Sequence, residues 1–178
     1  KKNAFLVSPV QLKQLERVIF DKIAAPRGHS VVNKDLIGKN ASVILSKIGV
    51  NVPDSVRLII AETDVNHPLV WTEQMMPVLP MVRVRNADEA IDIAKEAEQG
   101  CGHSAIMHSR NLDNLSRMAR VMNCSIFVKN GFGASGLGFN GVGFTSFTIA
   151  SPTGEGLTSP RSFSRERRCV MIDHFRIV

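Results

Sequence analysis

Tyrosine is absent from the 178-residue sequence, and aromatic residues make up only 6% of it. Proteins that bind single-stranded nucleic acids without sequence preference stack bases on aromatic side chains within a basic groove. The formal net charge is +6, and five arginines lie between positions 161 and 176, but no aromatic platform accompanies them. A positive net charge is also compatible with binding to an anionic cofactor or to an acidic subunit. We therefore expect no nucleic-acid partner.

Long apolar runs are missing as well. No stretch approaches the ~18 residues that a membrane-spanning helix requires, so we expect no membrane partner. The mean hydropathy is +0.03, and 44% of the residues are hydrophobic, which is typical of a globular domain with a core. The sequence begins Lys1-Lys2-Asn3, with neither an initiator methionine nor a leader peptide. We expect a piece of a longer protein.

The sequence contains three cysteines, and they are not spaced as metal ligands usually are. Cys101, Cys124 and Cys169 include no C-x-x-C pair, which argues against a disulfide framework or a zinc site and favours a reducing, cytoplasmic setting. None has a base or an oxyanion donor beside it, so we interpret all three as ordinary small residues, with Cys101 the most plausible reactive one. His103 and His108 flank a predicted strand at odd spacing and would point to opposite faces. They predict no joint metal site.

Strand and helix patterns alternate between residues 56 and 130, which predicts an α/β fold with a mostly parallel sheet and crossover helices. Beyond residue 150 the alternation stops, and the apolar-ended tail from residue 169 predicts a last strand that pairs outside its own sheet. Strands are expected at residues 2–7, 56–61, 78–84, 104–108, 124–129 and 144–150, and residues 62–68 are expected to form a polar connection. Helices are expected from Ser8 to about Ile23, from Asn33 to a left-handed cap at Gly49, from Asn86 to Gly100, and from Asn111 to Met122.

Residues 125–156 contain an unusual concentration of glycine, with six glycines between positions 131 and 143. Gly131, Gly133 and Gly136 match the dinucleotide fingerprint G-x-G-x-x-G directly after a predicted strand. The fingerprint needs a following helix to hold a pyrophosphate, and no helical period follows here. We prefer to interpret the segment as backbone that lines a site or packs against a partner. A flexible loop and a true fingerprint remain alternatives.

Several longer strings occur in one order along the chain: HP at 67–68, TEQMMPVLP at 72–80, CGHSAIMHSRN at 101–111, SIFVKNG at 125–131, PTGEG at 152–156 and RRCV at 167–170. Together they resemble the CoA-acylating aldehyde dehydrogenases of the ethanolamine- and propanediol-utilisation branch. The resemblance implies a three-layer α/β/α catalytic-domain fragment over residues 1–165 and an oligomerisation strand over residues 166–178. It places the nucleophilic cysteine and the cofactor domain upstream of Lys1, so we expect the fragment to be inactive alone.

The same resemblance implies roles for particular residues. Glu73 matches the family glutamate that hydrogen-bonds the nicotinamide ribose, Met75 stands in place of a frequent aromatic residue, and Pro77 matches the family proline. Without the resemblance, Glu73 could equally be an acid at a helix N-terminus. The substrate and thioester pocket is expected to be lined by His103, Gly131, Gly136, Gly138, Phe144, Thr148 and Ile149. Val142 stands where branch members often carry a glutamate, so the resemblance implies no polar role for it.

The implied reaction joins a short-chain aldehyde to CoA and reduces NAD, through a thioester on the upstream cysteine. The implied partners are the aldehyde, CoA and further copies of the chain in a homo-oligomer. The implied location is the cytoplasm, inside a bacterial microcompartment in this branch. The alternative from another functional class is a non-catalytic assembly module that acts through the tail strand and the basic surface.

Overall fold

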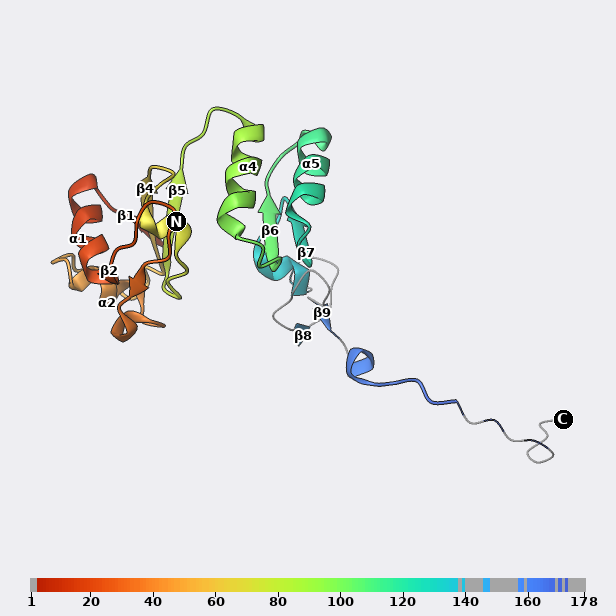
Figure 1. Cartoon of the computed structure of the whole chain (residues 1–178). Helices are drawn as coiled ribbons and strands as arrows, with labels where there is room; N and C mark the ends of the chain where they lie inside the picture. Colours follow the sequence, from red (N-terminus) through yellow and green to blue (C-terminus); the bar gives the residue numbers. More distant parts are fainter. Residues whose placement is uncertain are drawn as a thin grey trace. The chain divides into compact units, whose positions relative to one another are not determined.

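The computed structural model describes residues 3–137, 139, 146–147, 157–158, 160–168, 170 and 172. The chain divides into two compact units, Lys1–Ile93 and Ala94–Val178, and each is described by itself. Figure 1 gives the order of the elements along the chain.

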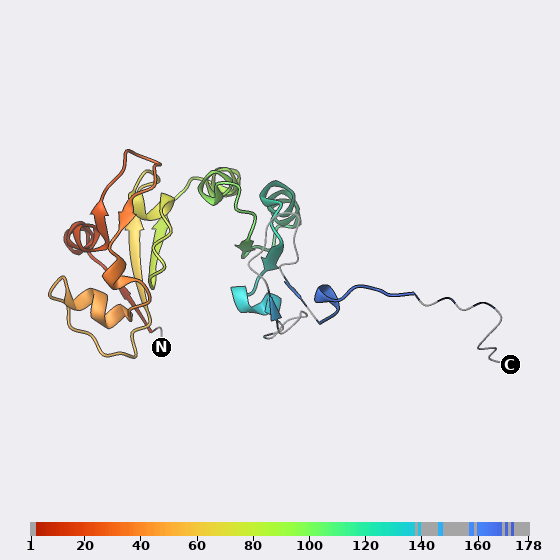
Figure 2. The same cartoon turned by 60° about the horizontal axis from the view of Figure 1, so that its bottom comes forward.

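The first unit is built on a parallel sheet of β1 (Ala4–Leu6), β4 (Leu58–Thr63) and β5 (Val78–Val82), in the order β1-β4-β5. β4 and β5 lie side by side along most of their length (Figure 2). The predicted mixed α/β fold with mostly parallel strands is confirmed here. β4 extends to Thr63, because it stays in register with β5 as far as Val82, so the predicted polar connection begins too early.

The first helix, α1 (Pro9–Ile19), starts with the predicted capping box. The Ser8 Oγ accepts a hydrogen bond from the Gln11 N–H at 3.3 Å, and the Gln11 Oε1 accepts one from the Ser8 N–H at 2.8 Å. The helix ends earlier than predicted, because the chain becomes extended and forms β2 (Phe20–Lys22), which pairs antiparallel with β3 (Val31–Val32).

The predicted helix that follows Asn33 is wrong as a single element. Asn33 caps only the 3-10 helix η1 (Lys34–Leu36), and the helix α2 (Ala41–Ser46) starts separately. Gly38 lies between them with a left-handed φ of +71°, and its N–H donates to the Met75 carbonyl at 3.1 Å. This contact with a residue far along the chain draws the backbone out of helical geometry.

The core of the first unit lies between one face of the sheet and the two helices. Its members with no solvent exposure come from α1, α2 and β4: Leu15, Ile19, Ile44, Leu45, Ile59 and Ala61. Burying a side chain of this size stabilises a fold by about 1.5–3 kcal/mol. The core therefore fixes β4, and with it the start of the segment that carries Glu73.

The second unit contains a parallel strand pair with its crossover helix. α4 (Ala87–Glu98) leads into β6 (Ser104–Met107), α5 (Leu112–Met122) follows, and β7 (Ile126–Lys129) pairs with β6. The predicted start of α5 is confirmed, because the Asn111 Oδ1 accepts from the N–H groups of Asp113 and Asn114 at 2.9 and 3.1 Å.

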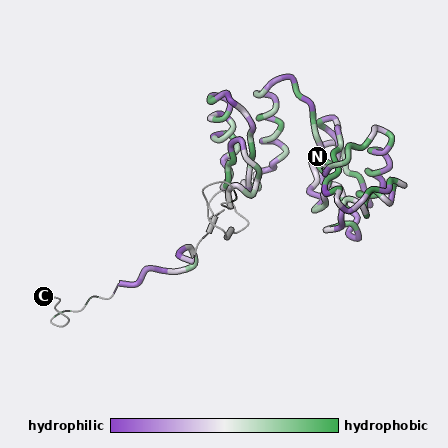
Figure 3. Tube along the Cα trace, turned by 180° about the vertical axis from the view of Figure 1, so that it is seen from behind, coloured by the Kyte–Doolittle hydropathy of each residue, from purple (hydrophilic) through white to green (hydrophobic). Residues whose placement is uncertain are grey.

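Beyond β7 the structure describes η2 (Gly133–Leu137), η3 (Pro160–Phe163) and a two-residue antiparallel pair, β8 (Ser146–Phe147) with β9 (Leu157–Thr158). Most of the predicted strand 144–150 and of the predicted tail strand lies outside the described residues. Residues 164–168 are exposed and form a hydrophilic stretch (Figure 3).

Candidate functional site

Glu73 lies in an exposed turn that leads from α3 (Pro68–Trp71) into β5, and not at a helix N-terminus. The helix α3 was not predicted from the sequence. Its only local signals are the His67 cap and the proline that follows. The Glu73 Oε1 accepts from the Met75 N–H at 2.7 Å, and Met75 has a left-handed φ of 54°. The second carboxylate oxygen has no hydrogen-bond partner in the described part of the chain, so it is available to a ligand hydroxyl.

The turn is held in place by the buried side chain of Gln74, which is 6% exposed. Its Nε2 donates to the Leu69 carbonyl at 2.8 Å and also to the Thr72 carbonyl. The Thr72 Oγ1 in turn accepts from the Ser30 N–H at 3.0 Å. Because the buried amide nitrogen donates to two backbone carbonyls, the adjoining Glu73 carboxylate is presented from a rigid base.

Residues 75–77 form one wall of a groove of about 290 Å³. The other walls are residues 38–41 and 56–57, which include the exposed cations Lys39 and Arg57. The groove thus combines an apolar methionine wall with positive charge, and Pro77 lies within the same wall as Met75.

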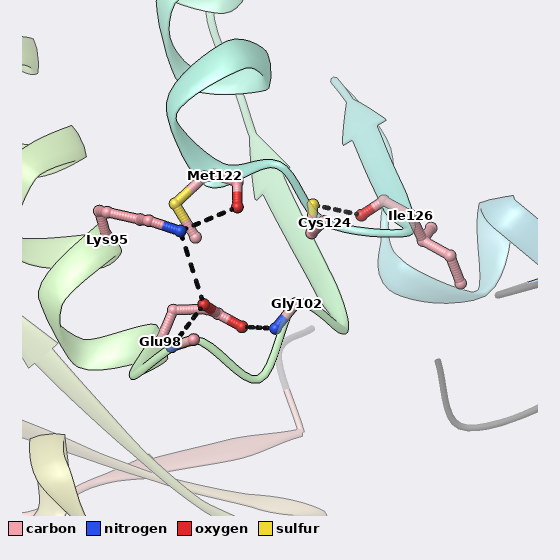
Figure 4. A network of polar contacts seen from close by, with 7 residues as sticks. Lys95, Glu98, Gly102, Met122, Cys124 and Ile126 are labelled. Carbon is pink, nitrogen blue, oxygen red and sulfur yellow. Dashed lines mark hydrogen bonds and ion pairs between the residues drawn. The ribbon is translucent and has the colours of Figure 1, made fainter. Parts of the chain in front are cut away.

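His103 precedes β6, and its Nδ1 lies 2.9 Å from the Ser104 Oγ. The loop in front of it is held by Glu98, whose side chain is 10% exposed (Figure 4). The Glu98 carboxylate accepts from the N–H of Gly100 at 3.1 Å and from the N–H of Gly102. Lys95 completes this network.

The Lys95 Nζ lies 4.0 Å from the Glu98 carboxylate and donates to the Met122 carbonyl at 3.2 Å (Figure 4). Met122 ends α5, so the network joins the ends of α4 and α5 just before the two parallel strands begin. Cations at helix C-termini are favourable because the last carbonyls lack helical partners. The position of His103 therefore depends on Glu98 and Lys95.

Gly131 lies past the opposite end of the same strand pair. Asn130 ties the strand ends together there: its Oδ1 accepts from the Ser109 N–H at 2.8 Å, and its Nδ2 donates to the Ser109 carbonyl at 2.9 Å. Because Ser104 pairs with Ile126 and the strands rise ~3.3 Å per residue, His103 and Gly131 are separated by roughly 20 Å. The structure does not bring the two together, and His108 is the histidine at the glycine end.

Residues 131–137 contain no α-helix, since Gly133 and Gly136 lie in the short 3-10 helix η2. The part of the fingerprint that the structure describes thus lacks the helix that dinucleotide binding requires. Phe132 and Phe139 stack edge to face across this segment, with centroids 5.2 Å apart. Of the predicted pocket residues, Gly138, Phe144, Thr148 and Ile149 lie outside the described residues.

The cysteines and acids form no further centre in the part of the chain that the structure describes. Cys101 is exposed, and the part-buried Cys124 donates its thiol to the Ile126 carbonyl at 3.1 Å; Cys169 lies outside the described residues. Over the same residues, no cluster of three or more histidine, cysteine or acidic side chains could hold a metal ion. None of the described helices is long and apolar enough to cross a membrane.

Comparison with known proteins identifies the family. The model of the aldehyde dehydrogenase family matches residues 57–154, which include the Glu73 turn, the start of β6 and the glycine segment. The chain belongs to the aldehyde dehydrogenase family. The acetaldehyde dehydrogenase (acetylating) EutE of Salmonella typhimurium is 51% identical over 176 residues, which are 99% of this chain and 38% of EutE. The chain thus spans well under half of this aldehyde dehydrogenase.

Solved structures agree with this assignment. The Rhodopseudomonas palustris propionaldehyde dehydrogenase with bound propionyl-CoA is 45% identical, with a TM-score of 0.81 over 94% of this chain and 36% of that one. A propionaldehyde dehydrogenase from the Clostridium phytofermentans fucose utilisation bacterial microcompartment is 40% identical, with a TM-score of 0.80 over 95% of this chain and 37% of that one. Both cover the two units described above.

Proposed function

We propose that the chain is the C-terminal part of a CoA-acylating aldehyde dehydrogenase, which converts a short-chain aldehyde, CoA and NAD to acyl-CoA and NADH. The observation that carries the proposal is the 51% identity to EutE over 99% of this chain, together with the match to a CoA-bound propionaldehyde dehydrogenase. A second structure of the latter enzyme holds CoA and an acylated cysteine, which supports a thioester route. In our proposal the nucleophilic cysteine precedes this chain.

In this proposal Glu73 hydrogen-bonds the nicotinamide ribose. Its exposed carboxylate, with one oxygen committed to Met75 and the other available, fits a ligand with hydroxyl groups. Met75 and Pro77 would then form the adjoining wall. NAD supplies the hydride acceptor, and the contribution of this chain is to orient the ribose so that the acceptor meets the aldehyde carbon.

The thioester pocket is proposed to follow the second unit from one end of β6 to the other. His103 lies at the near end and Gly131 with η2 at the far end, so the pocket would be elongated, as a pantetheine arm requires. Glycine backbone can approach a ligand closely and can move aside for a second acceptor. The further lining is proposed from Gly136, Gly138, Phe144, Thr148 and Ile149.

We further propose that residues 1–165 belong to the catalytic domain and that residues 166–178 pair with another copy in a homo-oligomer. The partners are a short-chain aldehyde and CoA, with no nucleic acid and no membrane. The proposed location is the cytoplasm, within a microcompartment, in line with the source of the Clostridium phytofermentans relative.

The test is an assay of the intact protein that contains this chain, with acetaldehyde or propanal, CoA and NAD. We expect CoA-dependent formation of NADH and of acyl-CoA, identified by mass spectrometry, and no turnover by the 178-residue chain alone. Replacing Glu73→Gln should raise the KM for NAD, whereas Glu62→Gln, in an exposed ion pair with Arg83, should not. Absence of acyl-CoA product from the intact protein would refute the proposal.

A further inference from the structure

His67 is a histidine that the function proposed above does not use, yet its side chain is only 12% exposed. It precedes α3 and caps it: the Nδ1 accepts a hydrogen bond from the Leu69 N–H at 3.2 Å. An acceptor at Nδ1 requires the tautomer that carries its proton on Nε2. That atom lies 3.9 Å from the Glu16 carboxylate of α1.

Leu69 connects this cap to the site. Its N–H is bonded to His67, and its carbonyl accepts from the buried Gln74 amide at 2.8 Å. Gln74 directly follows Glu73 and underlies the turn that presents the carboxylate. The route from the imidazole to Glu73 therefore runs through the backbone of one residue, Leu69, and one buried side chain, both with defined partners.

We propose that His67 is a positioning residue, whose neutral imidazole holds α3 and thereby the turn that presents Glu73, and that its protonation releases this turn. The consequence for the cofactor rests on the ribose-binding role proposed for Glu73. A proton on Nδ1 would replace the acceptor with a donor facing the Leu69 N–H, so the cap could not form. α3 has a single turn and depends heavily on such a cap.

Burial of the imidazole and the carboxylates near it shift the pKa of His67 in opposite directions. Burial lowers the pKa of His67 below its ordinary value of 6.5, and the carboxylates of Glu16 on α1 and of Asp64 after β4 partly offset this effect. The net lowering of the pKa keeps the imidazole neutral near pH 7. The cap is therefore intact under ordinary conditions.

The chain provides its own reporter, because Trp71 is the single tryptophan and tyrosine is absent. Trp71 lies in α3, and its Nε1 donates to the Val65 carbonyl at 2.6 Å. We expect its emission to follow a single-proton titration as the pH of the 178-residue chain falls from about 8 to 5, with an apparent pKa below that of free histidine, ~6.5.

Replacing His67→Asn supplies the decisive comparison, since asparagine caps helices well and does not titrate. The variant should keep the emission of the neutral state throughout this range, and His67→Gln serves if the first variant does not fold. His108→Asn, at an exposed histidine of the second unit, should keep the wild-type transition. A flat wild-type titration, or a transition that persists in both His67 variants, would overturn the proposal.

A second measurement separates this inference from the proposed function. In the intact enzyme, the KM for NAD should rise about fivefold through the same transition, the factor expected for loss of one N-cap, and it should stay level in the His67→Asn variant. If Glu73→Gln raises the KM but acid does not, the positioning role of His67 is refuted. If Glu73→Gln has no effect while the Trp71 transition depends on His67, the proposed cofactor contact fails and the link between His67 and α3 stands.

Discussion

Gly131, the first glycine after β7, offers a quantitative test of how tightly the glycine segment packs. A Cβ added there would lie 2.9 Å from the Ser135 Oγ and 3.2 Å from the Val128 Cγ1. The serine hydroxyl can rotate away, but Val128 is buried within β7, so the valine contact decides the cost. Overpacking of this kind costs about 1–3 kcal/mol, and the loss of unfolded-state freedom offsets about 0.4–1 kcal/mol.

We therefore expect Gly131→Ala to lower the free energy of unfolding by about 1–2 kcal/mol, measured by urea unfolding with far-UV circular dichroism. The matched control is Gly133→Ala, because a Cβ there meets only the Ile106 Cδ1 at 3.8 Å, which is ordinary contact. That variant should be as stable as the wild type or slightly more stable.

A double-mutant cycle identifies the cause. Val128→Ala destabilises the chain by itself, but it removes the methyl group that the new Cβ would meet. The double variant with Gly131→Ala should thus be more stable than the two single effects predict, with a coupling of about 1 kcal/mol. Strict additivity, or a Gly131→Ala variant as stable as Gly133→Ala, would show that the segment is not closely packed at this point.

Three further predictions concern the stability contributed by Glu98, Gly49 and His67. Glu98→Gln should cost about 1–3 kcal/mol in urea unfolding, because the Gly100 and Gly102 N–H groups bond to different carboxylate oxygens and the amide replaces one of these acceptors with an NH₂ donor. An unchanged midpoint would contradict the network. Gly49→Ala should cost about 1–2 kcal/mol from backbone conformation alone, since φ is +75° and a Cβ would meet nothing within 4 Å. Because the pKa of His67 is lowered in the folded state, the unfolded state takes up its proton first. Stability should therefore fall as the pH drops below about 6.5, and less steeply in the His67→Asn variant.

Elements set by nearby side chains were predictable from the sequence. The Ser8 capping box and the Asn111 cap place α1 and α5 correctly, because each depends on bonds that span at most three residues. The alternation of patterns likewise gives the parallel strands. The order of β6 and β7 follows from the crossover helix between them.

Features that depend on distant contacts were not predictable in the same way. The helix expected after Asn33 is interrupted because Gly38 bonds to Met75, which no local pattern reveals. The grouping of His103 with Gly131 came from the family resemblance, whereas the parallel strands place the two at opposite ends of β6 and β7. The parallel direction of the two strands is sufficient to predict this separation, because one residue precedes β6 and the other follows β7.

The candidate site residues Glu73, His103 and Gly131 share one structural feature. Each adjoins a loop whose backbone carries a positive φ, at Met75, Gly102 and Asn130. Each loop is held by one polar side chain bonded to backbone groups. Gln74 holds the loop at Glu73, Glu98 holds the loop before His103, and Asn130 holds the loop at Gly131.

This arrangement explains how a chain with short strands can present functional groups in defined positions. A left-handed backbone conformation costs about 1–2 kcal/mol at a non-glycine residue and persists only where its surroundings compensate. A carboxamide or carboxylate that satisfies two backbone groups provides that compensation, because an unpaired buried group would cost a similar amount. The positions of Glu73, His103 and Gly131 thus depend on the adjoining polar side chains. Substituting one of these adjoining side chains should disturb function without removing any group that contacts a ligand.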